Sequence, residues 1–224
     1  MTELRLVTDD FTAEGPFSEG SPLPLRLPPG RHQIPANVVR EHQRQRLLAA
    51  MAETIAAQGY ASVTTTAVSE RAGVSTSTFY KHFGNLWDCV LAAYVATSDR
   101  LCAAIEAACA ECDPREDPLD VGIEAALSFC VEAPAFAQLL CAQAPLEASA
   151  VAAARRILIS RLAAMLRRGS GERVDSAQPP GLDERMIDAT FVFLGSRIAT
   201  VGPAQLRELA PELATILSRP RQAA

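Results

Sequence analysis

The chain has 224 residues, of which 49% are hydrophobic, and it carries a net charge of -5 at pH 7. This length suffices for one domain with a buried core and a small second domain. The negative charge argues against a protein that coats nucleic acid indiscriminately. Residues 1–10 lack the blocks of a signal peptide, and no run of about twenty apolar residues exists, so we expect a cytoplasmic protein without a membrane partner.

The composition favours helices throughout. Alanine is abundant, and Thr, Val and Ile seldom alternate with polar residues in the period of two that strands require. We find no internal repeat and no heptad run long enough for a coiled coil. The sequence therefore predicts an all-α fold.

Residues 1–36 differ in composition from the rest of the chain. Six of the fifteen prolines precede Asn37, and residues 1–30 contain five acidic and only two basic side chains. Proline lacks the backbone donor that a helix or a central strand needs. We therefore expect a disordered, Pro-rich acidic arm, whose charge disfavours a contact with the minor groove of DNA.

Residues 37–58 have the pattern of an amphipathic helix that ends near Gly59. One broad face is predicted to be apolar, with Val38, Leu47, Leu48, Met51, Ile55 and Ala56. Arg40 and Arg44 lie elsewhere on this helix. They are candidates for contacts with phosphate, or alternatively belong to an ordinary solvated face.

The next segment predicts two short helices around one glycine. Threonine hydroxyls at 64–66 suit the start of a helix over 65–72, and Ser75 can cap a second helix that runs to about His82. Gly73 suits the sharp turn between them, and Val74 can fill the angle. Residues 37–85 carry five basic and three acidic side chains, so this region, unlike residues 1–30, is locally basic.

The second short helix carries the residue types that read DNA. Short hydroxyl side chains can approach base edges in the major groove, and flanking donors can hold phosphates. The candidates in this stretch are Thr76, Ser77, Thr78, Tyr80, Lys81 and His82. Phe79 and Phe83 are predicted to point inward. The alternative is a solvated helix face above a small aromatic core.

The stretch GYASVTTTAVSERAGVSTSTFYKHFGNL, residues 59–86, resembles the N-terminal signature of the TetR family of bacterial transcription regulators. Two residues depart from that pattern: Ser69 stands where alanine is usual, and Leu86 replaces a lysine that commonly contacts phosphate. Backbone N–H groups after Asn85 could still bind a phosphate there. The resemblance implies a helix-turn-helix DNA-binding domain over 37–84. The DNA-binding residues that it implies are Thr65, Thr66, Ser75, Thr76, Ser77, Thr78, Tyr80, Lys81, His82, Asn85 and Arg44.

Longer helices are predicted over the rest of the chain, separated by segments rich in proline and glycine. Their ranges are 85–112, 118–131, 134–141, 147–168, 182–201 and 203–218. The resemblance implies that residues 85–224 form a helical domain for binding a small-molecule effector and for dimerisation.

Two groups of apolar residues are candidates for these roles. The effector pocket is predicted from Phe129, Phe136, Met165, Phe191 and Phe193, with plain core packing as the alternative. The dimer interface is predicted from Met186, Thr190, Phe193, Arg197, Leu206, Leu209 and Leu213. Two such helical hairpins could pack about a two-fold axis, unless they belong to the core of one chain.

The pattern of the six cysteines favours a packing role over metal binding or redox chemistry. Cys109 and Cys112 form a C-x-x-C pair, but all three histidines lie in the arm or in the DNA-reading region. We therefore predict no metal site, no cofactor and buried cysteines that act as small apolar residues. Thiol sensing through Cys109 and Cys112 is the alternative.

Together these patterns predict a TetR-like regulator, a repressor that binds a palindromic operator as a homodimer and leaves it when a small molecule binds. Two alternatives come from other classes. A helical enzyme lacks support, because the chain has no phosphate-binding glycine loop and no Ser-His-Asp set. A helical binding protein that has lost DNA recognition is suggested only by Leu86 and the acidic arm.

Overall fold

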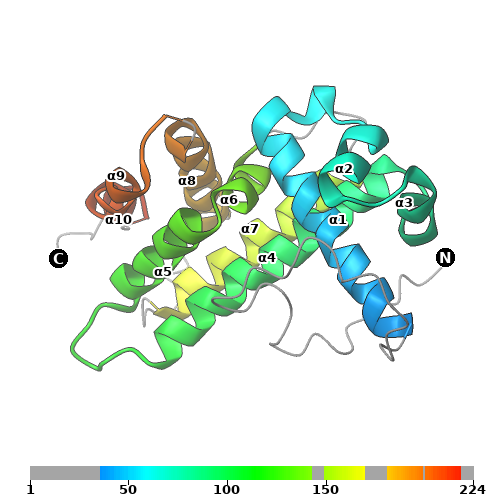
Figure 1. Ribbon diagram of the computed structural model, residues 1–224. Helices are drawn as coiled ribbons and strands as arrows, with labels where there is room; N and C mark the ends of the chain where they lie inside the picture. Colours follow the sequence, from blue (N-terminus) through cyan, green and yellow to red (C-terminus); the bar gives the residue numbers. More distant parts are fainter. Residues whose placement is uncertain (1–35, 143–148, 170–180, 199, 218–224) are drawn as a thin grey trace.

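The computed structural model of the protein describes residues 36–142, 149–169, 181–198 and 200–217. The regular structure in these ranges is helical, as the sequence predicts (Figure 1). The elements are α1 (Ala36–Gln58), the 3-10 helix η1 (Tyr60–Ser62), α2 (Thr65–Ala72), α3 (Thr76–His82), α4 (Leu86–Ala110), α5 (Pro118–Glu132), α6 (Pro134–Cys141), α7 (Ser149–Gly169), α8 (Leu182–Ile198), α9 (Pro203–Arg207) and α10 (Ala210–Leu217). The predicted arm lies outside the described residues, except that Ala36 begins α1.

Local capping chemistry explains where several helices begin. The Thr64 hydroxyl accepts from Ala67 N at the start of α2, and the Asp117 carboxylate accepts from Leu119 N at the start of α5. Pro118 and Pro134 occupy first helical positions, where the missing N–H costs nothing. These starts agree with the predicted boundaries to within a residue or two.

Two predicted boundaries near the C-terminus are wrong. The helix predicted over 182–201 ends at Ile198, and the N–H groups of Thr200 and Val201 both turn back to the carbonyl of Arg197. The helix predicted over 203–218 is two helices, α9 and α10. Pro211 explains this break, because its ring would clash with the carbonyl four residues earlier and it has no N–H to donate.

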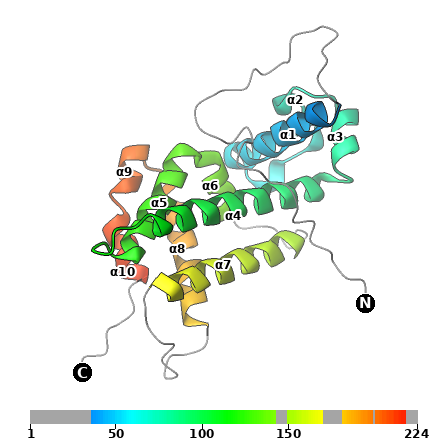
Figure 2. The ribbon, with the colours of Figure 1, turned by 90° about the horizontal axis from the view of Figure 1, so that it is seen from below.

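The helices form an elongated bundle with α1, α2 and α3 at one end and α9 and α10 at the other (Figures 1 and 2). The long helix α4 joins the two ends. α1 packs against α2, α4 and α6, while α5 packs against α4, α9 and α10. A division of the chain at residue 85 stays a prediction, because α1 also contacts the larger part of the chain through α6.

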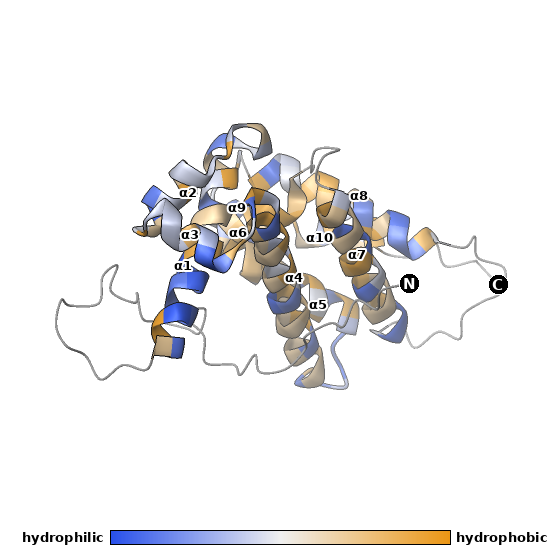
Figure 3. Ribbon diagram, turned by 90° about the vertical axis from the view of Figure 1, so that its right-hand side faces the viewer, coloured by the Kyte–Doolittle hydropathy of each residue, from blue (hydrophilic) through white to orange (hydrophobic). Residues whose placement is uncertain are grey.

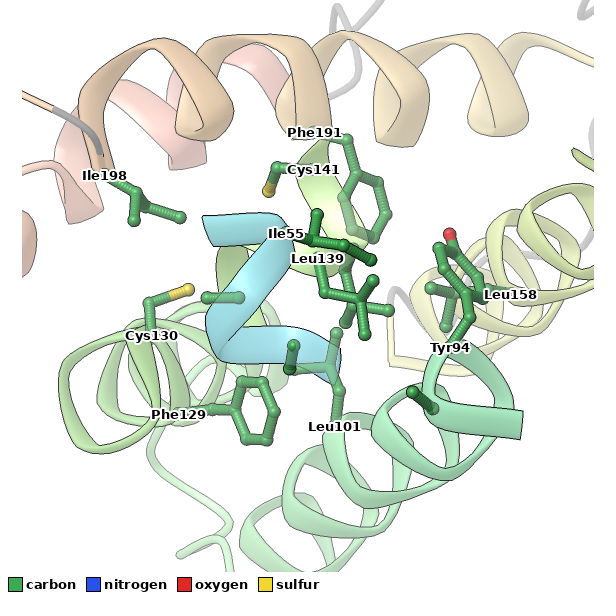
Figure 4. Close-up of a cluster of buried hydrophobic side chains, with 14 of the residues drawn as sticks. Ile55, Tyr94, Leu101, Phe129, Cys130, Leu139, Cys141, Leu158, Phe191 and Ile198 are labelled. Atoms are coloured by element: carbon green, nitrogen blue, oxygen red, sulfur yellow. The ribbon is translucent and has the colours of Figure 1, made fainter. Parts of the chain in front are cut away.

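The core is continuous across the bundle. Figure 4 shows buried side chains from different helices meeting at its centre, among them Ile55 of α1, Leu101 of α4 and Leu139 of α6. The predicted apolar face of α1 is confirmed at Leu47, Leu48, Met51 and Ile55, which are buried. Val38 is 52% exposed, so its prediction is wrong. It lies in the first turns of α1, which are largely hydrophilic (Figure 3).

Polar contacts join the small N-terminal helices to the rest. The Tyr60 hydroxyl, buried in η1, donates to the carbonyl of Leu139 at 3.3 Å. Arg155 of α7 donates to the carbonyl of Leu140 at 3.0 Å and pairs with Asp188 of α8 at 2.8 Å. The C-terminal end of α6 therefore receives hydrogen bonds from both parts of the molecule.

Candidate functional site

The turn between α2 and α3 is held by one glycine and one arginine. Gly73 is left-handed, with φ of 63°, and its N–H donates to the carbonyl of Glu70. The Arg46 guanidinium of α1 donates to the carbonyls of Ala72 and Gly73, the second at 3.2 Å. The left-handed backbone at position 73 favours glycine, and a Cβ atom there would lie 2.5 Å from Arg46 Nη2, so a larger residue would displace that guanidinium. Sequence reasoning missed Arg46.

One side of α3 is buried and anchors the helix. Phe79 is fully buried and Phe83 nearly so, with their ring centroids 5.6 Å apart, which confirms that both point inward. The opposite side is exposed at Thr76, Ser77 and Lys81, and Tyr80 is 56% exposed. The structure therefore brings four of the predicted DNA-reading side chains together on the outer face of a seven-residue helix.

Ser75 and Thr78 have structural contacts within α3. The Ser75 hydroxyl accepts from Thr78 N at 3.1 Å as the N-cap, and it lies 2.9 Å from the Thr78 hydroxyl and 2.8 Å from the Ser77 hydroxyl. These contacts fix the first turn of the helix. In α2, Thr65 is half-buried in the first turn and Thr66 is exposed.

The N-terminal half of α1 lies beside α3. Arg40 Nη2 lies 3.5 Å from the carbonyl of Lys81, and the Arg44 guanidinium stands 5.5 Å above the Phe83 ring. His82 Nε2 is 3.4 Å from Gln43 Oε1. Partial burial, and then the charges of Arg40 and Arg44, lower the pKa of His82. The imidazole is therefore neutral near pH 7 and offers a hydrogen bond rather than a charge.

Asn85 begins α4 through a capping box. Asp88 N donates to Asn85 Oδ1 at 3.0 Å, and Asn85 N donates to Asp88 Oδ2 at 3.2 Å. Leu86, which stands where the resemblance expects lysine, packs against the hydrophobic core. The Asp88 carboxylate occupies the first turn of α4, so a phosphate placed there would meet a like charge.

A cavity of about 470 Å³ lies at the other end of the bundle. It is enclosed by the C-terminal ends of α4 and α7, the N-terminal half of α5, α8 and α10. The larger apolar side chains of its wall are Ile105, Leu119, Ile123, Leu162, Met165, Leu166, Ile187, Leu194, Leu213 and Leu217. Its volume lies within the range of sites for small molecules, roughly 300–1,000 Å³.

Of the five residues predicted for the effector pocket, this cavity includes only Met165. The structure places the four phenylalanines beside arginines instead. The Arg100 guanidinium stands 5.5 Å from the Phe129 ring and 5.3 Å from the Phe136 ring. Arg155 lies over Phe191, and Arg197 lies over Phe193. Large rings fill space and attract cations, so they mark packed positions rather than empty ones.

Comparison with known proteins identifies the N-terminal end of the bundle. Residues 47–93 match the family model described as bacterial regulatory proteins, tetR family. The resemblance to the TetR family is confirmed. None of the curated protein sequences compared with the chain matches it.

Solved structures share the TetR-like fold over most of the chain. The fatty acid degradation regulator FadR from Bacillus halodurans is 16% identical with a TM-score of 0.65, and the similarity covers 79% of this chain and 99% of that one. FadR from Bacillus subtilis, in complex with stearoyl-CoA, is 20% identical with a TM-score of 0.61 and coverage of 77% and 96%. The regulator PfmR from Thermus thermophilus is 22% identical with a TM-score of 0.56 and coverage of 81% and 98%.

The predicted dimer residues of this TetR-like fold are largely turned inward. Leu206, Leu209 and Leu213 are buried in the core of the single chain, where α9 and α10 pack against α5. Met186 and Phe193 pack partly against the same core. Thr190 lines the cavity, as does Leu213.

The outer face of α8 is made by other residues. Its exposed positions are Arg185, Asp188, Ala189, Val192, Ser196 and Arg197, of which Arg197 alone belongs to the predicted set. Val192 is 54% exposed.

The cysteines are free thiols with suppressed reactivity. Burial raises the pKa of Cys89, Cys130 and Cys141 to about 12 and that of Cys102 to about 11. Cys109 lies in the wall of the cavity, 3.7 Å from the carbonyl of Pro118, and burial raises its pKa as well. Burial and the Glu116 carboxylate raise the pKa of Cys112. Because the thiolate is the reactive form, this environment disfavours thiol sensing.

The described ranges contain neither a cluster of metal ligands nor a single membrane-spanning helix. No group of three or more His, Cys, Asp or Glu side chains is placed there to hold a metal ion. No single helix within these ranges is long and apolar enough to cross a membrane. The pair α5 and α6 would reach that length and composition together, but the two helices are bent by 113°.

Proposed function

We propose that the chain is a DNA-binding transcriptional regulator rather than an enzyme, and that α3 is its recognition helix. The observation that carries this proposal is the division of α3 into two faces. Phe79 and Phe83 fix the helix from below, while Thr76, Ser77, Tyr80 and Lys81 stand on its exposed side. A helix anchored in this way can enter the major groove without losing its place on the protein.

Each exposed side chain has a chemical role in this proposal. Thr76 and Ser77, in the first turn of α3, can reach base edges with hydroxyls that donate or accept. Tyr80 and Lys81 can hold phosphates on either side of the groove. Thr65 and Thr66 start α2, and Thr66 is exposed there. Arg44 of α1 lies over the Phe83 ring, and His82 of α3 lies beside Gln43 of α1, so both hold α3 against α1. Ser75, Thr78 and Asn85 act through the helix caps in which they take part.

The regulator is proposed to act as a homodimer. Two copies related by a two-fold axis would place two α3 helices about 34–36 Å apart, one turn of DNA, and so match a palindromic operator. α9 and α10 pack against α5 of their own chain. We therefore propose that the exposed face of α8, centred on Val192, makes the dimer contact.

Val192→Asp is expected to weaken the dimer by about 2 kcal/mol or more, roughly thirtyfold in the dissociation constant, because it would bury an unpaired charge. Sedimentation equilibrium of the purified protein measures this constant. Val38→Asp is the matched control, since Val38 is equally exposed but lies on the first turns of α1. Equal dissociation constants for V192D and the wild type would place the interface elsewhere.

Release from DNA is proposed to follow the binding of a small molecule in the cavity. FadR from Bacillus subtilis was solved with stearoyl-CoA, which supports a small-molecule effector for a protein of this fold. A ligand can release DNA only if it prefers a conformation whose two recognition helices are wrongly spaced. Allosteric coupling between two sites is typically worth about 1–3 kcal/mol. Repression is the proposed outcome of DNA binding.

The proposal is tested by fluorescence anisotropy of the protein with a duplex from upstream of its own gene and with a scrambled duplex. We expect the upstream duplex to bind at least about a thousandfold more tightly, with an affinity that falls steeply as salt rises. Equal weak binding to both duplexes calls for selection of bound fragments from the whole genome. No preferred fragment in that selection would favour a helical protein that has lost DNA recognition.

A further inference from the structure

The cavity wall offers a buried ligand almost no polar partner. Besides Glu106 and Arg168, its polar side chains are Cys109 and Thr190. The Thr190 hydroxyl donates to the carbonyl of Met186 at 2.9 Å, and the Cys109 thiol points to the carbonyl of Pro118. A buried carboxylate or phosphate would find no donor from these side chains to replace water. The enclosed part of a ligand is therefore hydrocarbon.

The mouth of the cavity is marked by its most exposed lining residues. These are Glu106 and Ala110 near the end of α4 and Arg168 near the end of α7. Glu106 and Arg168 form a loose ion pair at 3.9 Å. A polar end group of the ligand would stay here, in contact with water.

The charge around this mouth is negative. From residue 106 to residue 120 the chain has one basic side chain, Arg115, and six acidic ones: Glu106, Glu111, Asp113, Glu116, Asp117 and Asp120. All seven are exposed. The other arginine at this end of α7, Arg167, is paired with Asp183 and Glu184.

Helix dipoles add to the negative potential at the mouth of the cavity. The C-terminal ends of α4 and α7 meet at the mouth, and a helix C-terminus carries partial negative charge. The last turn of α4 contains no basic residue that would offset it. The positive end of α5 is covered by the carboxylate of its cap, Asp117. The last turn of α7 carries Arg167 and Arg168, but each is paired with a carboxylate, Arg167 with Asp183 and Glu184 and Arg168 with Glu106. The remaining contributions favour a cation over an anion.

We infer that the effector is a lipophilic cation, whose hydrocarbon part fills the cavity while its positive group stays at the acidic mouth. This inference rests on the proposed function, because it names the ligand of the proposed effector site. It separates the chain from the FadR protein solved with stearoyl-CoA, since the phosphates of a coenzyme A group would meet the acidic segment.

The test uses three probes with the same hydrocarbon chain: decyltrimethylammonium, decanol and decanoate. Isothermal titration calorimetry with the full chain, below the aggregation limit of each probe, measures their dissociation constants. We expect decyltrimethylammonium to bind best and decanoate worst, with about a tenfold difference at low salt that shrinks as ionic strength rises. Equal affinities, or tighter binding of decanoate, would overturn the inference.

Four variants locate the binding. A Cβ at Gly122 would lie 3.6 Å from Ile105 Cγ2 and 3.8 Å from Cys109 Sγ, so Gly122→Ala fits, whereas Gly122→Leu extends into the cavity. We expect G122L to abolish binding of all three probes and G122A to keep it. Ala126→Met is the second plug, should G122L not fold. Glu106→Gln should weaken only decyltrimethylammonium, about two- to fivefold, and leave decanol unchanged.

The anisotropy experiment on DNA separates this inference from the proposed function. DNA binding without any probe binding would contradict the ligand class and leave the regulator intact. Probe binding by a protein that binds no DNA would support the ligand class and contradict the proposed function. Binding that persists in G122L and A126M would show that the probes coat the surface, and the inference would fail.

Discussion

Phe79→Ala is expected to lower the free energy of unfolding by about 3–5 kcal/mol, the range for removing a fully buried phenylalanine. Phe79 has no exposed surface and supports α3 through its contacts with Phe83 and the core beneath. Urea denaturation followed by circular dichroism measures the change. Loss of DNA binding should accompany it, because α3 has no other large anchor on its inner side than these two rings.

Tyr80→Ala is the matched control for this experiment. Tyr80 is the next residue on the same helix and has a ring of nearly equal size, but it is 56% exposed. Its removal should change stability by no more than about 0.5 kcal/mol, as is usual for surface positions. Similar destabilisation by F79A and Y80A would contradict the two-faced description of α3.

Combined replacement of Thr76, Tyr80 and Lys81 by alanine is expected to weaken specific DNA binding at least about a hundredfold, since one base contact worth about 1–3 kcal/mol and two phosphate contacts are lost from each protomer. All three side chains are exposed, so the fold should survive. Anisotropy with the preferred duplex measures the loss, and circular dichroism checks the helices.

The single variant Lys81→Ala separates phosphate contacts from base contacts. It should weaken binding to all sequences nearly equally and reduce the slope of log affinity against log salt by about one per protomer. Thr76→Ala should leave that slope unchanged and reduce the preference between duplexes. Tight DNA binding by the triple variant would contradict the assignment of the outer face of α3 as the recognition surface.

The sequence predicted the N-terminal helices well because their determinants are local. Ser75, Gly73 and Phe79 act through bonds and contacts within a few residues of themselves. Arg46 escaped notice because its partners lie 26 and 27 residues further along the chain. From sequence alone, an arginine on the polar face of an amphipathic helix is predicted to be exposed to solvent, because the turn that it contacts is distant in the chain.

The cavity and the dimer face were harder to predict. A cavity is the space that five helices leave, so no single stretch of sequence encodes it, and the phenylalanines proposed for it are packed under arginines. Leu206, Leu209 and Leu213 show the spacing of an apolar helix face, which is the same for a core and for an interface. The break before α10 was readable from Pro211, but the apolar pattern across it favoured one helix.

The length of α4 sets the scale of the movement that regulation would need. At a rise of about 1.5 Å per residue, its 25 residues span about 37 Å from the capping box at Asn85 to the cavity wall. A tilt of about five degrees around the cavity end would then displace Asn85 by about 3 Å. In a symmetric dimer both recognition helices would shift together, so the distance between them could change by about 6 Å against a DNA turn of about 34 Å. A ligand that tilts α4 by only a few degrees could therefore take the two α3 helices out of register with the major groove.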